Sequence, residues 1–154
     1  MGGKGIINNK IKPVIGHAII KSLKSPKVEL KDFISLPDDS SFTQLELPNL
    51  VEYQDRFYWI ISVTKRVNQA QHESEVSPQV RIYKTKKLEK ILSKGEIVLD
   101  GDKSGYYGMN IVQNSLTPQG NIEARVFYVP GLAPNGKELS LPKTISFNLD
   151  NFSF

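Results

Sequence analysis

The side chains of this sequence that could do chemistry are carboxylates, because the other usual catalytic residues are scarce. The sequence has no cysteine and only two histidines, His17 and His72. Without cysteine there are no disulfides, cysteine zinc sites or thiol catalysis. Neither histidine stands at metal-ligand spacing from other ligands, and no G-x-S-x-G, G-x-G-x-x-G or Walker motif is present. We therefore predict no metal site and no cofactor.

One carboxylate, Glu46, lies ahead of the longest apolar run of the chain and beside a proline and an asparagine, in "TQLELPNLVEYQDRFYWIISVTKR" (residues 43–66). Strand alternation predicts one face made of Leu45, Leu47, Asn49, Val51 and Tyr53, and another made of Gln44, Glu46, Pro48, Leu50 and Glu52. By this pattern alone Glu46 is a solvated strand residue. Pro48, however, indicates an edge strand or the start of a strand, where Glu46 could face a pocket and act as a general acid.

The elements that must position Glu46 are strands, because short β-branched and aromatic runs alternate with Gly, Pro, Asn and Asp. We expect about eight strands in up-and-down order, at residues 15–22, 46–51, 57–64, 79–84, 95–99, 106–114, 122–129 and 144–149. They predict an all-β fold of two four-stranded antiparallel sheets, arranged as a sandwich, a barrel or two blades of a β-propeller. The run "FYWIISV" predicts a strand buried on both faces, which favours blades.

The connections between these strands carry turn signals. "YQDR" (residues 53–56) predicts a tight hairpin turn, since Asp55 tolerates left-handed backbone angles. Residues 114–121 predict a second turn, whereas 67–78 and 130–142 predict surface loops. Residues 85–92 could form a turn or two of helix, or a loop. The glycine-rich start, "MGGKG", is interpreted as a flexible terminus.

Size and charge limit the partners. The 154 residues suit one domain, and the net charge of +4 comes from scattered lysines and arginines. The one basic cluster, "YKTKKLEK" (residues 83–90), is broken by Glu89 and lacks interleaved aromatics, so we interpret it as a solvated connection and predict no nucleic-acid partner. No apolar run approaches the ~18 residues of a membrane span. The N-terminus does not resemble a signal peptide, so the location stays open.

The stretch "QLELPNLVEYQDRFYWIISVTK" resembles the region around the acid/base glutamate of glycoside hydrolase family 68, which contains levansucrases, inulosucrases and related β-fructofuranosidases. Family members carry a Q-T-E-R-P-H or E-R-A-N type motif, followed by a V-x-x-D-G-K-Y-Y-L-F hairpin. The positions that match without a gap are Gln44, Glu46, Pro48, Asn49, Leu50, Val51, Arg56, Phe57, Tyr58 and Lys65. The likeness continues, in order, through "IGHAIIKSLKSPKVEL", "VRIYKTKKLEKILSKGEIVLDGD", "GYYGMNIVQNS" and "LPKTISFNLDNFSF".

The resemblance implies that residues 1–154 are one partial domain, the C-terminal blades of a five-bladed β-propeller. In the family an aspartate attacks the fructosyl carbon of sucrose and a glutamate protonates the leaving glucose, before water or a growing fructan takes the fructosyl group. By position Glu46 is similar to that acid/base. Tyr107 is similar to the tyrosine lining the sugar pocket, and Asn49, Lys65 and Arg66 are further expected substrate-binding residues. Sucrose or a fructan is the implied partner.

Other family properties depend on segments outside this sequence. The family's calcium site is formed largely by such segments, and its members are often extracellular. The nucleophile and the R-D-P stabiliser also belong to earlier blades. Four aspartates lie near enough in sequence to be considered as substitutes, and none occupies the nucleophile's position: Asp38, Asp39, Asp100 and Asp102. Because retaining hydrolysis needs two carboxyl groups about 5 Å apart, we expect the isolated chain to be inactive.

This sequence also departs from the family at the site itself. Leu47 replaces an arginine that holds substrate hydroxyls, and leucine donates no hydrogen bond. Thr64 replaces a histidine or arginine, while Gly108 and Met109 replace a serine and a histidine. These departures favour an alternative in which the chain is a catalytically dead remnant or a weak carbohydrate-binding β-domain. A third possibility is an unrelated β-domain that makes protein contacts.

The resemblance has one consequence for assembly. Two blades without their neighbours would leave apolar faces and strand edges open. We therefore expect self-association or poor stability of the chain alone, unless missing N-terminal blades cover these faces.

Overall fold

The computed structural model describes residues 2–7, 9–22, 24, 26–37, 42–66, 76–101, 106–128 and 142–153. Its strands are β1 (Gly2–Ile7), β2 (Lys10–Ile15), β3 (Ala18–Ile20), β4 (Val28–Leu30), β5 (Phe42–Tyr53), β6 (Arg56–Arg66), β7 (Val76–Thr85), β8 (Glu96–Asp100), β9 (Tyr106–Ile111), β10 (Asn121–Tyr128) and β11 (Lys143–Asn148). A short 3-10 helix, η2 (Leu149–Asn151), follows the last strand. None of the described segments is a helix long and apolar enough to span a membrane.

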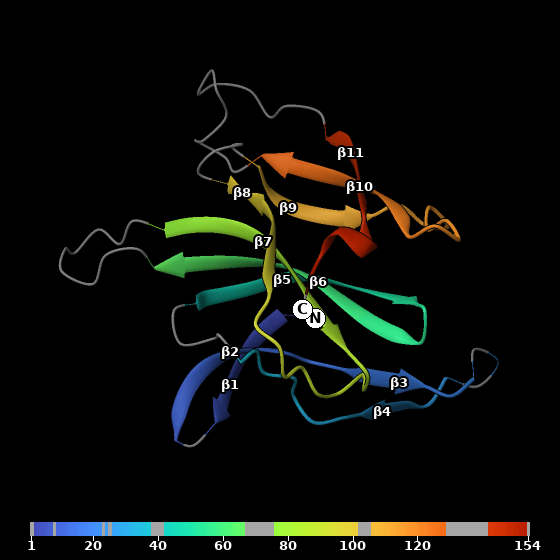
Figure 1. Ribbon diagram of the computed structural model, residues 1–154. Helices are drawn as coiled ribbons and strands as arrows, with labels where there is room; N and C mark the ends of the chain where they lie inside the picture. Colours follow the sequence, from blue (N-terminus) through green and yellow to red (C-terminus); the bar gives the residue numbers. More distant parts are fainter. Residues whose placement is uncertain are drawn as a thin grey trace.

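The strands pair into small antiparallel sheets, none of them closed (Figure 1). A four-stranded sheet has the up-and-down order β5-β6-β7-β8, and a three-stranded sheet has the order β11-β10-β9. Two hairpins, β1–β2 and β3–β4, precede them. The prediction of an all-β fold is confirmed. The expected pair of four-stranded sheets is not what the described residues form, because the second sheet has three strands and residues 15–22 divide between β2 and β3.

The hairpin between β5 and β6 fixes the register of the largest sheet. Gln54 and Asp55 both have positive φ, at 50° and 55°. Two consecutive left-handed residues form a type I′ turn, whose twist matches that of the strands beside it. The predicted turn at residues 53–56 is therefore confirmed, and it pairs Tyr53 with Arg56. The turn before β10 is confirmed as well, with Gly120 at φ 77°.

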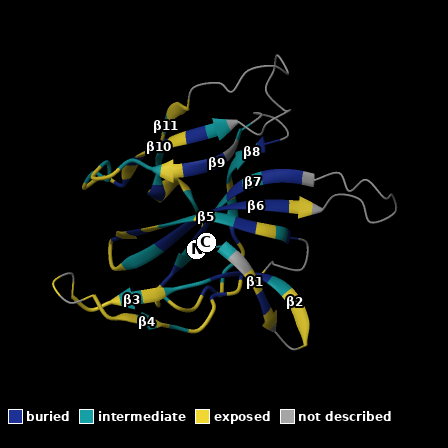
Figure 2. Cartoon of the chain, turned by 180° about the vertical axis from the view of Figure 1, so that it is seen from behind, coloured by how far each residue is buried: buried dark blue, intermediate teal, exposed yellow. Residues whose placement is uncertain are grey.

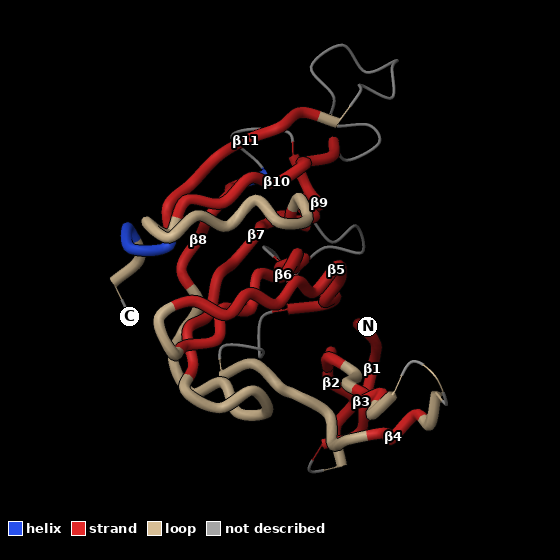
Figure 3. Tube along the Cα trace, turned by 90° about the vertical axis from the view of Figure 1, so that its right-hand side faces the viewer, coloured by secondary structure: helices blue, strands red, loops and turns tan. Residues whose placement is uncertain are grey.

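Two cores cover the two faces of the four-stranded sheet, which is the middle of three layers in Figure 3. The first core, shared with β9 and β10, contains Val51, Tyr53, Tyr58, Ile60, Val80, Ile82, Met109, Ile122, Ala124, Val126 and Leu149. The second core, shared with the N-terminal segment, contains Ile15, Ile34, Leu36, Phe42, Leu45, Trp59, Ile61, Val63, Tyr83 and Ile91. Successive residues of "FYWIISV" alternate between the cores, as strand geometry requires. Its predicted burial on both faces is confirmed, and β6 is buried along most of its length (Figure 2).

The glycine-rich N-terminus is a strand rather than a flexible terminus. β1 pairs with β2 from Gly2↔Ile15 to Ile7↔Lys10. Gly2 lies so close to β5 that an added Cβ would overlap the carbonyl oxygen of Leu45. Glycine permits this approach because it has no side chain. The interpretation of "MGGKG" as flexible is therefore wrong, and β1 runs beside the strand that carries Glu46.

Two further expectations concern connections. Residues 86–95, between β7 and β8, form an irregular connection and not a helical turn, with an isolated bridge between Lys87 and Lys90. The loop predicted at 67–78 ends within β7, which begins at Val76. The rest of that loop, with His72, and nearly all of the loop predicted at 130–142 lie outside the described residues.

Candidate functional site

The strand that carries Glu46 is interrupted by a bulge. Glu46 pairs with Ser62 and Asn49 pairs with Ile60, so that two residues, Leu47 and Pro48, lie opposite Ile61 alone. An unequal count of this kind defines a β-bulge, which bends the strand and redirects its side chains. Leu47 has a left-handed φ of 46°, which is unusual for a leucine. Bulges are frequent next to functional sites because they aim side chains that a regular strand would not.

The bulge changes which residues share a face. Leu45 packs in the second core, whereas Val51 and Tyr53 pack in the first. Glu46 lies opposite Ser62, so it belongs to the face that the first core covers farther along the sheet. Asn49, opposite Ile60, belongs to the same face. The expected alternation across residues 44–53 is therefore wrong, because the extra residue reverses it, and Glu46 and Asn49 are brought to one side of the sheet.

Glu46 lines a small hollow at the edge of the sheet. The hollow measures about 150 Å³ and is lined by Gly2, Lys4, Thr43, Gln44, Leu45 and Glu46. Glu46 is half-buried there, and the exposed Lys4 of β1 brings a positive charge to the same hollow. Lys4 was not predicted as a site residue, since nothing in a glycine-rich terminus indicates that it packs beside β5. The carboxylate is accessible without being fully solvated, which is what an acid that meets a ligand requires.

Ser62 is a second polar residue that the sequence did not indicate. It is buried and lies directly opposite Glu46. Its Oγ has no hydrogen-bond partner among the residues that the structure describes. Buried hydroxyl groups normally have a partner, so this one calls for an explanation. The only sequence signal is that it is the one polar residue within "FYWIISV".

Asn49 joins the bulge to the neighbouring sheet. Its amide nitrogen donates to the carbonyl oxygens of Leu47 at 2.8 Å and Met109 at 2.9 Å. Its Oδ1 accepts a hydrogen bond of 3.1 Å from the backbone N–H of Ile111. Both donors of the amide are thus engaged within the protein, and they hold β5 against β9. Its expected role in substrate binding stays a prediction, and its observed contacts position the bulge that carries Glu46.

Two departures from the family pattern lie in contact with each other. The side chain of Leu47 extends over Gly108 of β9, where an added Cβ would lie 2.8 Å from Leu47 Cδ1. A larger residue at 108 would therefore displace the leucine. Met109, beside Gly108, is fully buried in the first core. Thr64 is also buried, and its carbonyl oxygen accepts a hydrogen bond from the Thr43 hydroxyl at 3.1 Å.

Of the other predicted substrate-binding residues, Lys65 is the one whose side chain the structure describes, and it lies away from Glu46. Lys65 is exposed and pairs with Phe42. It is three residues beyond Ser62 on β6, so alternation turns it to the opposite face of the sheet from Glu46. The side chains of Arg66 and Tyr107 lie outside the described part of the chain. Their roles stay predictions.

Asp100 is too distant from Glu46 to serve as the nucleophile of a retaining pair. It pairs with Gln79, which pairs with Val63, which pairs with Leu45, next to Glu46. Three interstrand spacings amount to roughly 14 Å, against the ~5 Å between the two carboxyls of a retaining pair. Asp38, Asp39 and Asp102 lie outside the described residues. Within the described ranges no group of three or more His, Asp or Glu side chains is arranged to hold a metal ion.

Comparison with known proteins adds no relative. No family model, no curated protein and no solved structure matches this chain. A functional assignment therefore depends on the residues and their geometry.

Proposed function

We propose that this chain carries the acid/base half of a retaining site that transfers or hydrolyses the fructosyl group of sucrose or a fructan. It would be the C-terminal part, or a truncated relative, of a family 68 glycoside hydrolase. The observation that carries the proposal is Glu46. It is half-buried, lies within the family-like motif, directly precedes a bulge and lines an open hollow. A solvated strand glutamate needs none of these features.

The layered sheets support the propeller that the proposal requires. β5–β8 form an up-and-down sheet covered on both faces, as a propeller blade is by its neighbours. β1 and β9 both contact β5. In the proposed arrangement β5–β8 are one blade, β9–β11 belong to the next, and Glu46 lies on an inner strand facing the axial cavity.

In the proposed reaction Glu46 protonates the glycosidic oxygen as glucose leaves. Its carboxylate then takes a proton from the water or fructan hydroxyl that receives the fructosyl group. The aspartate that forms the covalent intermediate would come from segments outside this sequence. The isolated chain should therefore bind sugar and release no glucose.

A second candidate, sugar binding without catalysis, is favoured by the contact between Leu47 and Gly108. An apolar side chain occupies the position of the expected arginine, and the neighbouring glycine leaves room for it. Leucine offers no hydrogen bond to a sugar hydroxyl. In this candidate the hollow retains Glu46 as a hydrogen-bonding group for a sugar, without a transition state to stabilise.

Saturation-transfer NMR with sucrose and a short fructan tests the binding that both candidates share. We expect saturation of the fructosyl protons, with affinity about tenfold weaker in Glu46→Gln, the loss of one charged hydrogen bond. Glu52→Gln is the matched control, because Glu52 is exposed on the same strand beyond the bulge. No saturation, or equal effects of the two variants, would contradict the proposal.

Two further measurements test whether the chain holds only half of a site and whether the hollow has a fructosyl-site origin. Glucose release from sucrose, abolished by Glu46→Gln, would mean that the chain contains its own nucleophile and that the half-site proposal is wrong. Leu47→Arg restores the missing donor. If the hollow belongs to a degenerate fructosyl site, this variant should bind the fructan more tightly than the wild-type chain, and unchanged affinity would favour a binding module of another origin.

A further inference from the structure

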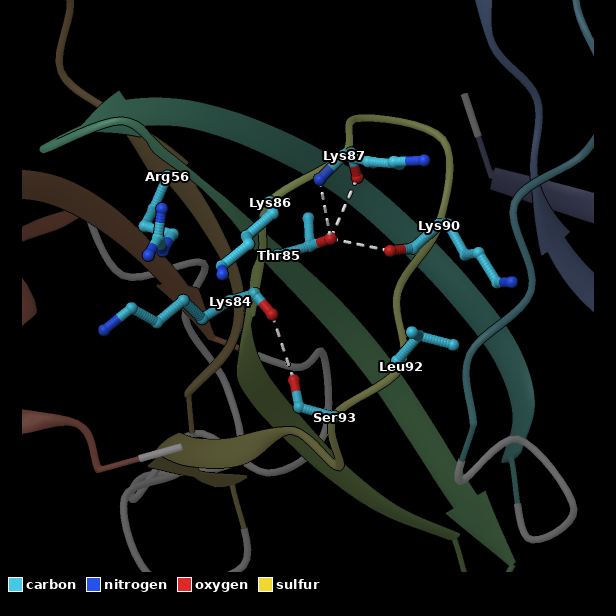
Figure 4. A pocket seen from close by; sticks show the side chains of 8 residues that line it. All are labelled: Arg56, Lys84, Thr85, Lys86, Lys87, Lys90, Leu92 and Ser93. Carbon is cyan, nitrogen blue, oxygen red and sulfur yellow. Dashed lines mark hydrogen bonds between the residues drawn. The ribbon is translucent and has the colours of Figure 1, made fainter.

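A larger hollow lies at the end of the four-stranded sheet that carries the β5–β6 turn, away from Glu46. Figure 4 shows this hollow from close by. It measures about 520 Å³, within the range of small-molecule sites. It is formed where the β5–β6 turn meets the connection from β7 to β8. Its lining residues are Arg56, Lys84, Thr85, Lys86, Lys87, Lys90, Leu92 and Ser93. Five of these eight are cations, and no carboxylate is among them.

The cations of the lining fall into two groups. In Figure 4 the side chains of Arg56, Lys84 and Lys86 extend to one side of the connection, and those of Lys87 and Lys90 extend to the other. The Lys84 ammonium also lies over the ring of Tyr58, 5.6 Å from its centroid. Arg56 donates to the backbone carbonyl of Asp55 at 3.0 Å, which leaves other guanidinium donors for a ligand.

The backbone that presents these lysines is fixed by its own polar contacts. The Thr85 hydroxyl lies 2.6 Å from the carbonyl oxygen of Lys90 and 2.9 Å from that of Lys87 (Figure 4). It also accepts from the N–H of Lys87 at 3.2 Å. Ser93 donates to the carbonyl of Lys84 at 3.1 Å. These bonds hold the ends of the connection together, so the backbone that carries the lysines is fixed before any ligand arrives.

Apolar anchors fix the same connection against the sheet. Ile91 is buried in the second core, and Leu88 packs against that core. The indole N–H of Trp59 donates to the carbonyl of Leu88 at 3.2 Å. An ordinary solvated loop needs no such anchoring. Arg56, Lys84 and Lys86 extend to the same side of this frame (Figure 4). Like charges on one side repel one another, and an anion that binds among them relieves that repulsion.

The lining indicates the class of anion. Lysine ammonium groups bind phosphate as point charges, and arginine binds it through paired donors. Single-stranded nucleic acids also need aromatic side chains on which bases stack, and the lining contains none. The exposed Leu92 supplies an apolar wall instead. We infer that this hollow binds a small ligand carrying two or more phosphate groups. The inference is independent of the proposed function at Glu46.

The test is isothermal titration of the whole chain with inorganic pyrophosphate at ~50 mM salt, where charge contacts are weakly screened. We expect saturable binding of one ion per chain. Arg56→Gln/Lys86→Gln should weaken it about tenfold or more, since each substitution removes a charged contact on the side to which both side chains extend. Lys86 is exposed and Arg56 directly follows the β5–β6 turn, so the variant should fold, which a thermal melt verifies. Lys24→Gln/Lys27→Gln removes the same net charge from exposed positions near β4 and should bind like the wild-type chain.

Three outcomes would overturn the inference. The first is no saturable binding of pyrophosphate. The second is equal loss in the two double variants, which would indicate attraction by net charge alone. The third is a short single-stranded RNA that binds far more tightly than pyrophosphate and protects several nucleotides, which would identify a nucleic-acid surface in place of a small-ligand site.

Discussion

The two faces of the four-stranded sheet are both buried, but their covers differ. The three-stranded sheet covers one face and is held there by polar contacts, from Asn49 to β9 and from Tyr53 to Asp150. The β1–β2 hairpin and the segment with Ile34 and Leu36 cover the other face. The hydrogen bonds between Ile15 and Ile34 join parts of that cover to each other and not to the sheet. Several of the exposed large apolar residues belong to this N-terminal cover: Ile6, Ile11, Ile20, Val28, Leu30 and Phe33. The difference teaches that a layer can bury a sheet face while its own outer surface stays apolar. The self-association expected from the sequence would therefore involve the N-terminal layer.

The largest effect is expected from truncating adjacent residues of β6 that face opposite covers. Ile60 and Ile61 are each 0% exposed and pack in the first and second cores. Each change to alanine should lower the free energy of unfolding by about 3 kcal/mol, measured by urea denaturation. We expect Ile60→Ala to cost more, because a cross-linked cover relaxes less around a cavity. A larger loss for Ile61→Ala would reverse the comparison.

Removing the link between β5 and β9 should have the next largest effect. Asn49→Ala leaves the Met109 carbonyl and the Ile111 N–H without this partner and should cost about 2 kcal/mol. Hydrogen exchange at β9 should accelerate as well. Asn110→Ala, at an exposed position of β9, serves as the control. Equal destabilisation by the two variants would mean that Asn49 is not a specific link.

A smaller loss of folding stability, confined to alkaline pH, is expected from the ionisation of Tyr53. Burial, and then the hydrogen bond to Asp150, raise the pKa of the Tyr53 hydroxyl above its ordinary value. The unfolded chain therefore ionises first, so the stability from this group is complete below about pH 10 and is lost as pH rises through the folded-state pKa.

Two variants test this dependence through urea unfolding from pH 8 upward. Tyr53→Phe should remove the alkaline loss that comes from this hydroxyl. Asp150→Asn should reduce that loss without removing it, because burial is the larger cause. An unchanged alkaline slope in Tyr53→Phe would contradict the assignment.

The smallest change in folding free energy, within about 0.5 kcal/mol, is expected for the exposed hairpin pair. Ile6 and Ile11 lie directly opposite each other and are 77% and 74% exposed. If the N-terminal layer causes the expected self-association, Ile6→Lys/Ile11→Glu should shift sedimentation towards the monomer at unchanged net charge. Ile97→Lys, on β8, should not. Association that persists unchanged in the hairpin variant would exclude this surface.

Part of this architecture could be predicted from local pattern. The turn chemistry at Gln54 and Asp55 and the unbroken apolar run of β6 indicate a hairpin and a doubly buried strand from residue types alone. The basic hollow was not predicted, since a lysine-rich loop is interpreted as solvated until its anchors at Trp59 and Ile91 are known. The face of Glu46 was predicted wrongly, because alternation assumes that no residue is inserted between strands.

The sequence by itself determined the all-β class, the turns and the choice of Glu46 as the candidate acid. These depend on residue types and preferences within short stretches of the chain. Only the tertiary structure decided that Leu47 and Pro48 form a bulge, that β1 runs beside β5, and that Arg56 joins the lysines beyond β7. Each of these depends on contacts between segments distant in sequence. The physical reason is that strand pairing and packing set which face a side chain occupies, and one inserted residue is enough to turn Glu46 from one side of the sheet to the other.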